Sequence, residues 1–109
     1  MVTFDYHSGE KHLVCKFSGH LDTFNCVKLA ETMQNKIREL RQGQSEENKL
    51  EDKIDFDMKD VTFISSSFIR IALTVFHQCQ QGNFAIINCD PFLKKIFKIA
   101  GLDDLLGVS

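Results

Sequence analysis

The sequence predicts a small α/β domain with a mixed central sheet, elements in the order β-β-α-β-α-β-α and helices packed on the sheet. Three observations support this prediction. A length of 109 residues fits one domain, residues 1–109, with a single core. Two β-like runs open the chain, and helical patterns then alternate with short apolar runs. Strands that are separated by helices run parallel and are joined by right-handed crossovers.

The two opening runs, residues 2–7 and 12–17, are separated by the polar loop 8–11, which contains glycine and predicts a hairpin. In the second run, Val14 adds an apolar residue to the face that also carries Lys16. Both faces are therefore partly apolar. This pattern predicts a strand inside the sheet rather than at a solvated edge.

Residues 18–23 are expected to break this strand, and either Asp22 or Thr23 is expected to cap the helix that follows. Apolar residues then recur at helical spacing up to Gln42-Gly43 and predict an amphipathic helix that covers one face of the sheet. The predicted inward stripe consists of Phe24, Val27, Ala30, Met33, Ile37 and Leu40. Residues 44–53 are polar and charged, which predicts a solvated, mobile connector.

The second half of the chain repeats the alternation of strand and helix. Residues 54–58 predict a strand, and a helix with an unusually broad apolar stripe is expected from about residue 66 to 81, with Gly82 as its cap. Residues 84–89 (FAIINC) predict another strand. Asp90-Pro91 then opens a last helix, which ends at Gly101.

Composition excludes several classes of function. The net charge of −2 argues against nucleic acid or an anionic membrane as the main partner, because both normally require a basic patch. The N-terminus lacks a signal-peptide pattern and no apolar run is long enough to span a bilayer, so a cytoplasmic protein is expected. The widely spread cysteines contain no C-x-x-C and predict reduced, buried thiols: Cys15, Cys26, Cys79 and Cys89.

Motifs for catalysis or metal binding are missing from the sequence. The histidines show no ligand spacing, and no phosphate-binding loop, nucleophile elbow or zinc-protease motif occurs. We therefore predict no cofactor, no metal site and no catalytic residue. The histidines are His7, His12, His20 and His77.

The candidate functional site is Ser65–Ser67, at the junction between a predicted strand and a predicted helix. Serine is a favoured N-cap, and a helix N-terminus presents free backbone N–H groups to an anion. Functional positions in α/β domains are expected at the carboxyl ends of parallel strands. Because residues 18–22 follow a second such end, the two segments are expected to meet.

Four segments together resemble the STAS domain of anti-sigma-factor antagonists, the SpoIIAA-like bacterial regulators. Residues 18–22 (SGHLD) are similar to the family's G-x-L-D, and residues 57–67 to its apolar-Asp segment that ends in D-S-S-G. Gly82 precedes the FAIINC run, and residues 100–105 (AGLDDL) are similar to the closing G-L motif. The resemblance covers nearly the whole chain and implies a STAS-like fold.

The resemblance also implies a non-enzymatic partner switch in transcriptional signalling. In this family a GHKL-type serine kinase that acts as an anti-sigma factor phosphorylates the first serine of D-S-S-G, and a PP2C-type phosphatase reverses this. The unphosphorylated form binds the kinase. By position the phosphoacceptor is Ser66, with Ser67 as the alternative, and Asp22 and Asp57 flank it. The implied partner-binding residues are Gly19, His20, Asp22, Asp57, Ser65, Ser67, Phe68 and Arg70.

This sequence departs from the family motif at three positions. Ser65 replaces the aspartate before the phosphoserine, Phe68 replaces the glycine after the serine pair, and Arg70 replaces a small residue. Phe68 either fills space at the kinase interface or blocks a close approach. Arg70 lies four residues after Ser66, so on a helix it either pairs with a phosphate or faces solvent.

Other interpretations remain open at this stage. The serines can act as helix caps alone, Asp22 can be a cap or an interface residue, and Asp57 can brace the serine loop through backbone N–H groups. A constitutive STAS scaffold without a phosphorylation cycle is the main alternative function. An enzyme of small α/β type, with a catalytic cysteine, is a third. The oligomeric state is not predicted.

Overall fold

Four strands and three helices follow one another in the predicted order over the described residues, 1–45 and 47–109, of the computed structural model. The α/β class and the element order β-β-α-β-α-β-α are therefore confirmed. The elements are β1 Val2–His7, β2 His12–Leu21, α1 Thr23–Arg41, β3 Lys53–Ile64, α2 Ser66–Gln78, β4 Phe84–Ile87 and α3 Pro91–Ile99.

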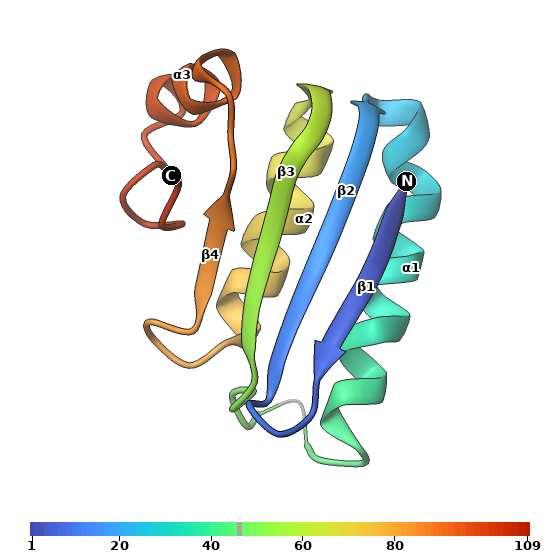
Figure 1. The fold of residues 1–109 in the computed structure, drawn as a ribbon. Coiled ribbons are helices and arrows are strands. Elements are labelled where there is room, and N and C mark those ends of the chain that lie inside the picture. The colour runs from blue at the N-terminus through green and yellow to red at the C-terminus, as the bar shows by residue number, and fades with distance from the viewer. Residues whose placement is uncertain (46) are drawn as a thin grey trace.

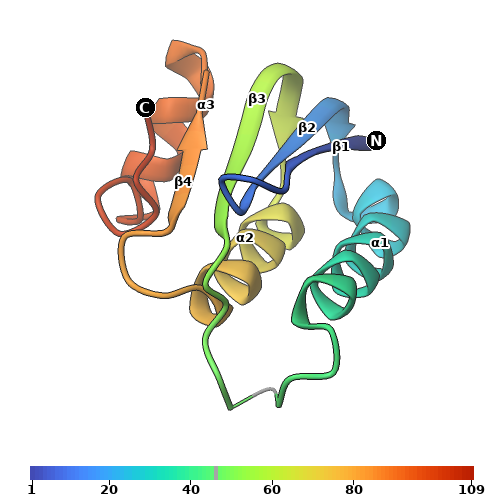
Figure 2. The same ribbon diagram turned by 60° about the horizontal axis from the view of Figure 1, so that its bottom comes forward.

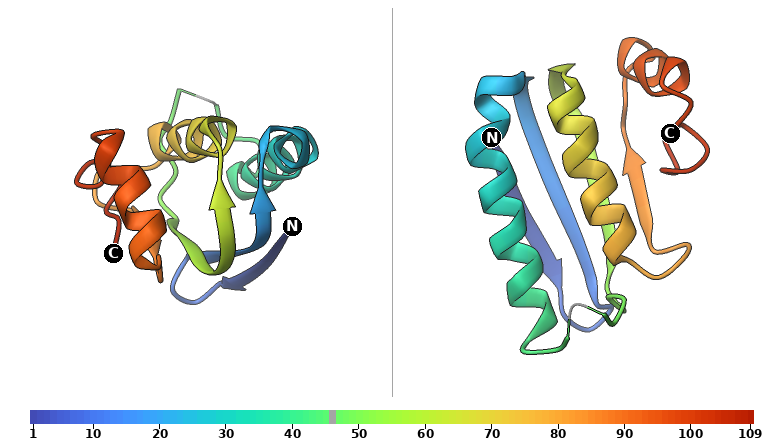
Figure 3. Two further views of the ribbon diagram at one scale, coloured as in Figure 1. Left: turned by 90° about the horizontal axis from the view of Figure 1, so that it is seen from above. Right: turned by 180° about the vertical axis from the view of Figure 1, so that it is seen from behind.

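The strands form one mixed sheet in the order β1-β2-β3-β4 (Figure 1). β1 and β2 pair antiparallel as the predicted hairpin, while β2 with β3 and β3 with β4 pair parallel. α1 and α2 lie side by side on the same side of this sheet (Figure 2). α3 lies beyond β4, so no described helix covers the opposite face of the strands (Figure 3).

The core fills the space between the sheet and the α1–α2 layer. Phe17 of β2 contacts Phe56 of β3, with ring centroids 4.7 Å apart in an edge-on arrangement. Phe68 of α2 meets Phe17 edge-on at 5.1 Å. Edge-to-face geometry is favourable for aromatic pairs, so these phenylalanines stabilise the packing of α2 on the centre of the sheet.

The C-terminal segment returns to the sheet after α3. Val108 forms a parallel bridge with Ile86, and the backbone N–H of Ile86 donates to the carbonyl of Gly107 at 3.2 Å. Leu106 is fully buried. The segment after α3 therefore covers the outer edge of β4, which would otherwise present unpaired backbone groups.

The predicted inward stripe of α1 is wrong in its first half. Phe24 is 85% exposed, Val27 is 73% exposed, and Ala30 is exposed as well. Cys26 and Leu29 are buried in their place, in line with Met33. Two rows at helical spacing are present in this segment, and the row of Cys26, Leu29, Met33 and Ile37 is the one buried against the sheet. The thiol of Cys26 makes a weak contact with the carbonyl of Leu21, at 3.7 Å, at the start of this row.

Both parallel strands before the helices run further than predicted. β2 continues through residues 18–21, the segment expected to break it, and β3 continues to Ile64. The pairing of β2 with β3 shifts register between Lys16 and Ser18 and again between Gly19 and His20. Gly19 has a φ of +88°, which glycine adopts readily, so it accommodates a bulge instead of ending the strand.

α2 ends earlier than predicted, at Gln78 rather than near residue 81. Cys79 is extended and forms a parallel bridge with Leu50, which draws the chain out of the helix. Gly82, with a φ of +86°, therefore lies in the turn before β4 and is not the helix cap.

The connector after α1 is less open than its composition suggested. The Arg41 guanidinium donates to the carbonyls of Ser45 and Asn48, and Leu50 is buried. The prediction of mobility is not tested, and residue 46 lies outside the described residues.

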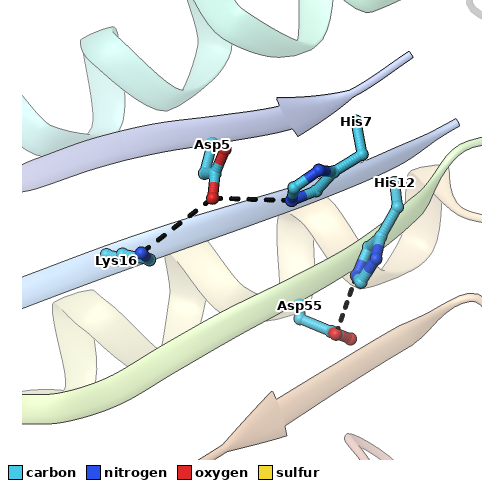
Figure 4. Close-up of polar contacts among 5 residues, drawn as sticks. All are labelled: Asp5, His7, His12, Lys16 and Asp55. Carbon is cyan, nitrogen blue, oxygen red and sulfur yellow. Dashed lines mark hydrogen bonds and ion pairs between the residues drawn. The ribbon is translucent and has the colours of Figure 1, made fainter. Parts of the chain in front are cut away.

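The sheet face that faces away from α1 and α2 carries polar side chains (Figure 4). His12 Nε2 lies 2.9 Å from Asp55 Oδ2, and His7 Nε2 lies 3.4 Å from Asp5 Oδ2. Asp55 is only 7% exposed, and its Oδ1 has no hydrogen-bond partner in the described structure. His12 is therefore the contact that compensates the buried Asp55 carboxylate.

Candidate functional site

The two predicted site segments meet at the carboxyl ends of β2 and β3. Leu21 and Ile64 are paired at the end of the two strands, and the backbone N–H of Ser65 donates to the carbonyl of Leu21 at 2.9 Å. α1 and α2 both begin at this end of the sheet (Figure 1). The prediction that the segments come together is confirmed.

Each helix at this edge has a side-chain cap. The Asp22 carboxylate accepts the backbone N–H of Asn25 at 2.8 Å, so Asp22 is the N-cap of α1. Ser65 is the N-cap of α2, and its hydroxyl accepts the N–H of Phe68 at 3.4 Å. Of the three consecutive serines, only the first is therefore used as the cap.

Ser66 and Ser67 occupy the first two helical positions of α2. The side chain of Ser66 is exposed and makes no hydrogen bond to any described residue, whereas the Ser67 hydroxyl donates to Thr23 Oγ1 at 3.4 Å. Backbone N–H groups in the first turn of a helix have no intrahelical acceptor. Ser66 thus combines an accessible hydroxyl with an end of the helix that favours negative charge.

Aromatic and aliphatic side chains are also present on the neighbouring segments at this end of the sheet. The exposed His20 ring stacks on Phe63, with centroids 4.5 Å apart and an interplanar angle of 17°. Phe24 and Val27 project from the first turns of α1, next to Thr23. The sequence prediction placed Phe24 and Val27 on the inward face of the helix and so missed them as surface residues. The alternative apolar row of Cys26, Leu29, Met33 and Ile37 was the signal that they point outward.

Phe68 does not contribute to this surface, contrary to prediction. Its side chain is 0% exposed and packs against Phe17 in the core. A residue at the third helical position of α2 points down onto the sheet, because the cap at Ser65 fixes the rotation of the helix. Phe68 is therefore a core residue and not part of the exposed surface at this edge.

The predicted position of Asp57, beside Ser66, is also wrong. Its carboxylate accepts the side-chain amide of Asn88 at 3.0 Å and the backbone N–H of Lys59 at 3.1 Å. Asp57 stands several residues before the end of β3, which at the usual rise of a strand places it roughly 20 Å from the serines. It neither flanks Ser66 nor braces the serine loop.

Arg70 is exposed on α2 and lines a groove between α1 and α2. It lies one helical turn beyond Ser66, so it remains on the same side of the helix as the candidate phosphoacceptor. No described carboxylate pairs with it.

The cysteines are free and buried, as predicted. Burial raises the pKa of Cys15 to about 12 and that of Cys79 to about 11, so both remain protonated thiols. A nucleophilic cysteine normally has a lowered pKa and an accessible sulfur. In residues 1–45 and 47–109, no group of three potential metal ligands converges, and no helix has the length and apolarity needed to cross a bilayer.

These features define a class: an α/β domain with one helical layer, in which a serine-opened helix meets the bulged end of a neighbouring strand. Residues 4–109 match the sequence profile of the STAS domain. The chain therefore belongs to the STAS domain family. No curated protein matches the sequence significantly.

Solved structures of anti-sigma-factor antagonists share the fold at low sequence identity. One from Mycobacterium paratuberculosis is 16% identical with a TM-score of 0.76, over 99% of this chain and 83% of its own. Unphosphorylated SpoIIAA is 16% identical with a TM-score of 0.72, over 100% and 88%. A STAS domain protein from Planctomyces limnophilus is 19% identical with a TM-score of 0.74, over 99% and 87%.

Proposed function

We propose that this protein is a cytoplasmic, non-enzymatic anti-sigma-factor antagonist that acts as one domain in a phosphorylation-controlled partner switch. The observation that carries the proposal is the position of Ser66. Its exposed hydroxyl stands at the N-terminus of α2, beside an exposed apolar surface on α1. The proposed partners are a GHKL-type serine kinase that is also an anti-sigma factor and a PP2C-type phosphatase.

A phosphate on Ser66 suits the fold but not a closely packed partner. It adds about −1.5 to −2 charges. At the helix N-terminus this charge is worth about 0.3–1 kcal/mol of stabilisation, so the fold tolerates it. A partner that covers Phe24 and Val27 would bury the same phosphate close to the Asp22 carboxylate. Binding is therefore lost while the domain stays folded.

The departures from the family motif are compatible with this switch. Ser65 occupies the place of the family aspartate and still caps α2, so the helix N-terminus keeps its orientation. Phe68 occupies the place of the glycine and fills the core, leaving the surface around Ser66 unobstructed. Neither change removes the accessible hydroxyl.

A constitutive scaffold is the second candidate. The observation in its favour is that the hydroxyls of Ser65 and Ser67 already have structural partners, Phe68 and Thr23. In that case the serine run would serve only to join β3 to α2. Such a scaffold would bind its partner without any modification at Ser66.

Phosphorylation by a GHKL kinase from the same genome, with ATP and Mg²⁺, distinguishes the two candidates. We expect mass spectrometry of the intact chain and its peptides to find one phosphate on Ser66. Ser66→Ala should abolish this phosphate, and the matched variant Ser67→Ala should retain it. Stable kinase binding with no phosphate on any serine would favour the scaffold and contradict the switch.

A further inference from the structure

A groove of about 460 Å³ runs between α1 and α2, on the side of these helices that faces away from the sheet. α1 and α2 lie next to each other along its length (Figure 3). Its volume falls in the range of about 300–1,000 Å³ that is typical of small-molecule sites. The lining residues are Ala30, Met33, Gln34, Ile37, Arg38, Arg41, Arg70, Ile71, Thr74, Val75 and Gln78.

The floor and the walls of this groove differ in character. Met33 and Ile37 of α1 and Ile71 and Val75 of α2 belong to the hydrophobic core and form an apolar floor. Polar side chains from the two helices stand at the sides. An occupant with both an apolar body and a polar group would match both parts.

All three arginines of the chain, Arg38, Arg41 and Arg70, line this one groove. Among residues 1–45 and 47–109, no lysine, aspartate or glutamate lines it, and none of the three arginines forms an ion pair. The groove is thus locally positive in a chain whose net charge is −2. The guanidinium group is suited to bidentate recognition of carboxylate and phosphate.

Arg41 is held in the groove by hydrogen bonds to its neighbours. It is only 6% exposed, and its guanidinium donates to the carbonyls of Ser45 and Asn48 and to the Gln78 side-chain oxygen, at 3.1, 2.7 and 3.0 Å. These acceptors are neutral, so the positive charge of Arg41 adds to those of Arg38 and Arg70 at the groove.

We infer that the α1–α2 groove binds a small amphiphilic oxyanion, with a carboxylate or phosphate head at the arginines and an apolar body on the floor. The inference is of a binding site, because no histidine, cysteine, serine, aspartate or glutamate is found among the described lining residues. The inference does not depend on the proposed function, since the groove contains none of the three serines.

NMR titration of the full-length, ¹⁵N-labelled chain tests this inference with decyl phosphate, decanoate and inorganic phosphate. We expect saturable shifts at the backbone amides of Ala30, Ile71 and Thr74 with at least one of the two amphiphiles. The comparison of decyl phosphate with decanoate identifies the preferred head group. Inorganic phosphate should bind more weakly than either, because it cannot use the apolar floor.

Arg38→Gln/Arg70→Gln removes two exposed guanidinium groups and leaves the buried Arg41 in place. Its dissociation constant for the preferred amphiphile should rise about tenfold or more, because charge-assisted hydrogen bonds are lost. The matched control, Lys94→Gln/Lys95→Gln, removes the same charge from exposed positions on α3 and should bind unchanged. The single variants Arg38→Gln and Arg70→Gln replace the double variant if it is poorly folded.

Three results would overturn the inference. The first is non-saturable or scattered shifts with both amphiphiles. The second is equal weakening in the arginine and lysine variants, which would indicate only a net-charge effect. The third is binding of inorganic phosphate as tight as that of decyl phosphate.

Discussion

The three consecutive serines have three different environments. Ser65 caps α2, Ser66 exposes its hydroxyl, and Ser67 donates to Thr23. The serine run could be recognised from sequence as a helix start. Which serine becomes the cap could not, because that depends on where β3 ends, and β3 continues to Ile64 in contact with Leu21.

Phe68→Ala should destabilise the whole domain and not the site alone. Truncating a buried phenylalanine costs about 3–5 kcal/mol of the free energy of unfolding. Urea denaturation followed by circular dichroism measures this loss.

Phe24→Ala is the matched control, because Phe24 is an exposed aromatic residue close to the same site. It should change stability by no more than about 0.5 kcal/mol. In the proposed switch it should instead weaken kinase binding. A Phe68→Ala variant as stable as the parent chain would contradict the core position of Phe68.

His12→Ala should be destabilising, although its side chain lies on the sheet face that carries no helix. Without the contact to His12 Nε2, the buried Asp55 carboxylate loses its partner, which should cost about 1–3 kcal/mol. Thermal or urea unfolding measures the change.

His7→Ala provides the comparison, because His7 and Asp5 form a half-exposed pair worth about 0–1 kcal/mol. Equal losses for the two variants would show that Asp55 does not depend on His12.

At the scale of the elements, periodicity predicted where each helix lies better than which way it faces. Two apolar rows share the sequence of α1, and in the structure the row that contains Cys26 is buried, which leaves Phe24 exposed. The extent of α2 depended on a distant segment, since the bridge between Leu50 and Cys79 ends the helix. Such tertiary contacts cannot be predicted from the local sequence.

The helix caps allow stability to be separated from function. Asp22 caps α1 at the site, and Asp90 caps α3, the helix beyond β4, each accepting a backbone N–H at 2.8 Å. Replacing either with alanine should cost about 0.5–2 kcal/mol in urea denaturation. Only Asp22→Ala should also alter kinase affinity, as measured by calorimetry. Equal effects of the two variants on affinity would mean that Asp22 acts through stability alone.

At the scale of the whole molecule, the alternation of strand and helix was enough to predict the α/β class and the mixed sheet. The sequence did not show that α1 and α2 share one side of the sheet, or that Val108 returns to pair with Ile86. The α1–α2 groove also escaped prediction. Arg70 is far in sequence from Arg38 and Arg41, and it joins them in one groove only because two crossovers place both helices side by side.

The buried thiols predict a loss of stability in alkali. The pKa of Cys15 is raised to about 12 and that of Cys89 to about 11, from 9.0, because burial disfavours the thiolate. Below pH 9.0 this contribution to the free energy of unfolding is fully present. Above it the unfolded chain releases protons that the folded chain retains, so stability falls as pH rises through the folded pKa values.

Urea denaturation at about pH 7 and about pH 10 measures this pH dependence. For each protein, the free energy of unfolding at the higher pH is compared with its own value at neutral pH. The decrease should be smaller for Cys15→Ala than for the parent chain. An identical loss in the variant and the parent would assign the alkaline effect to other groups.

The most direct test of the proposed switch compares kinase affinity before and after phosphorylation of Ser66. Calorimetry with the GHKL kinase should show binding to the unmodified chain. For the Ser66-phosphorylated chain, the affinity should be lower by about a hundredfold or more, since unfavourable charge contacts at an interface cost several kcal/mol. The melting temperature should be nearly the same for both forms. Equal affinity of the two forms, with phosphate present on Ser66, would contradict the switch.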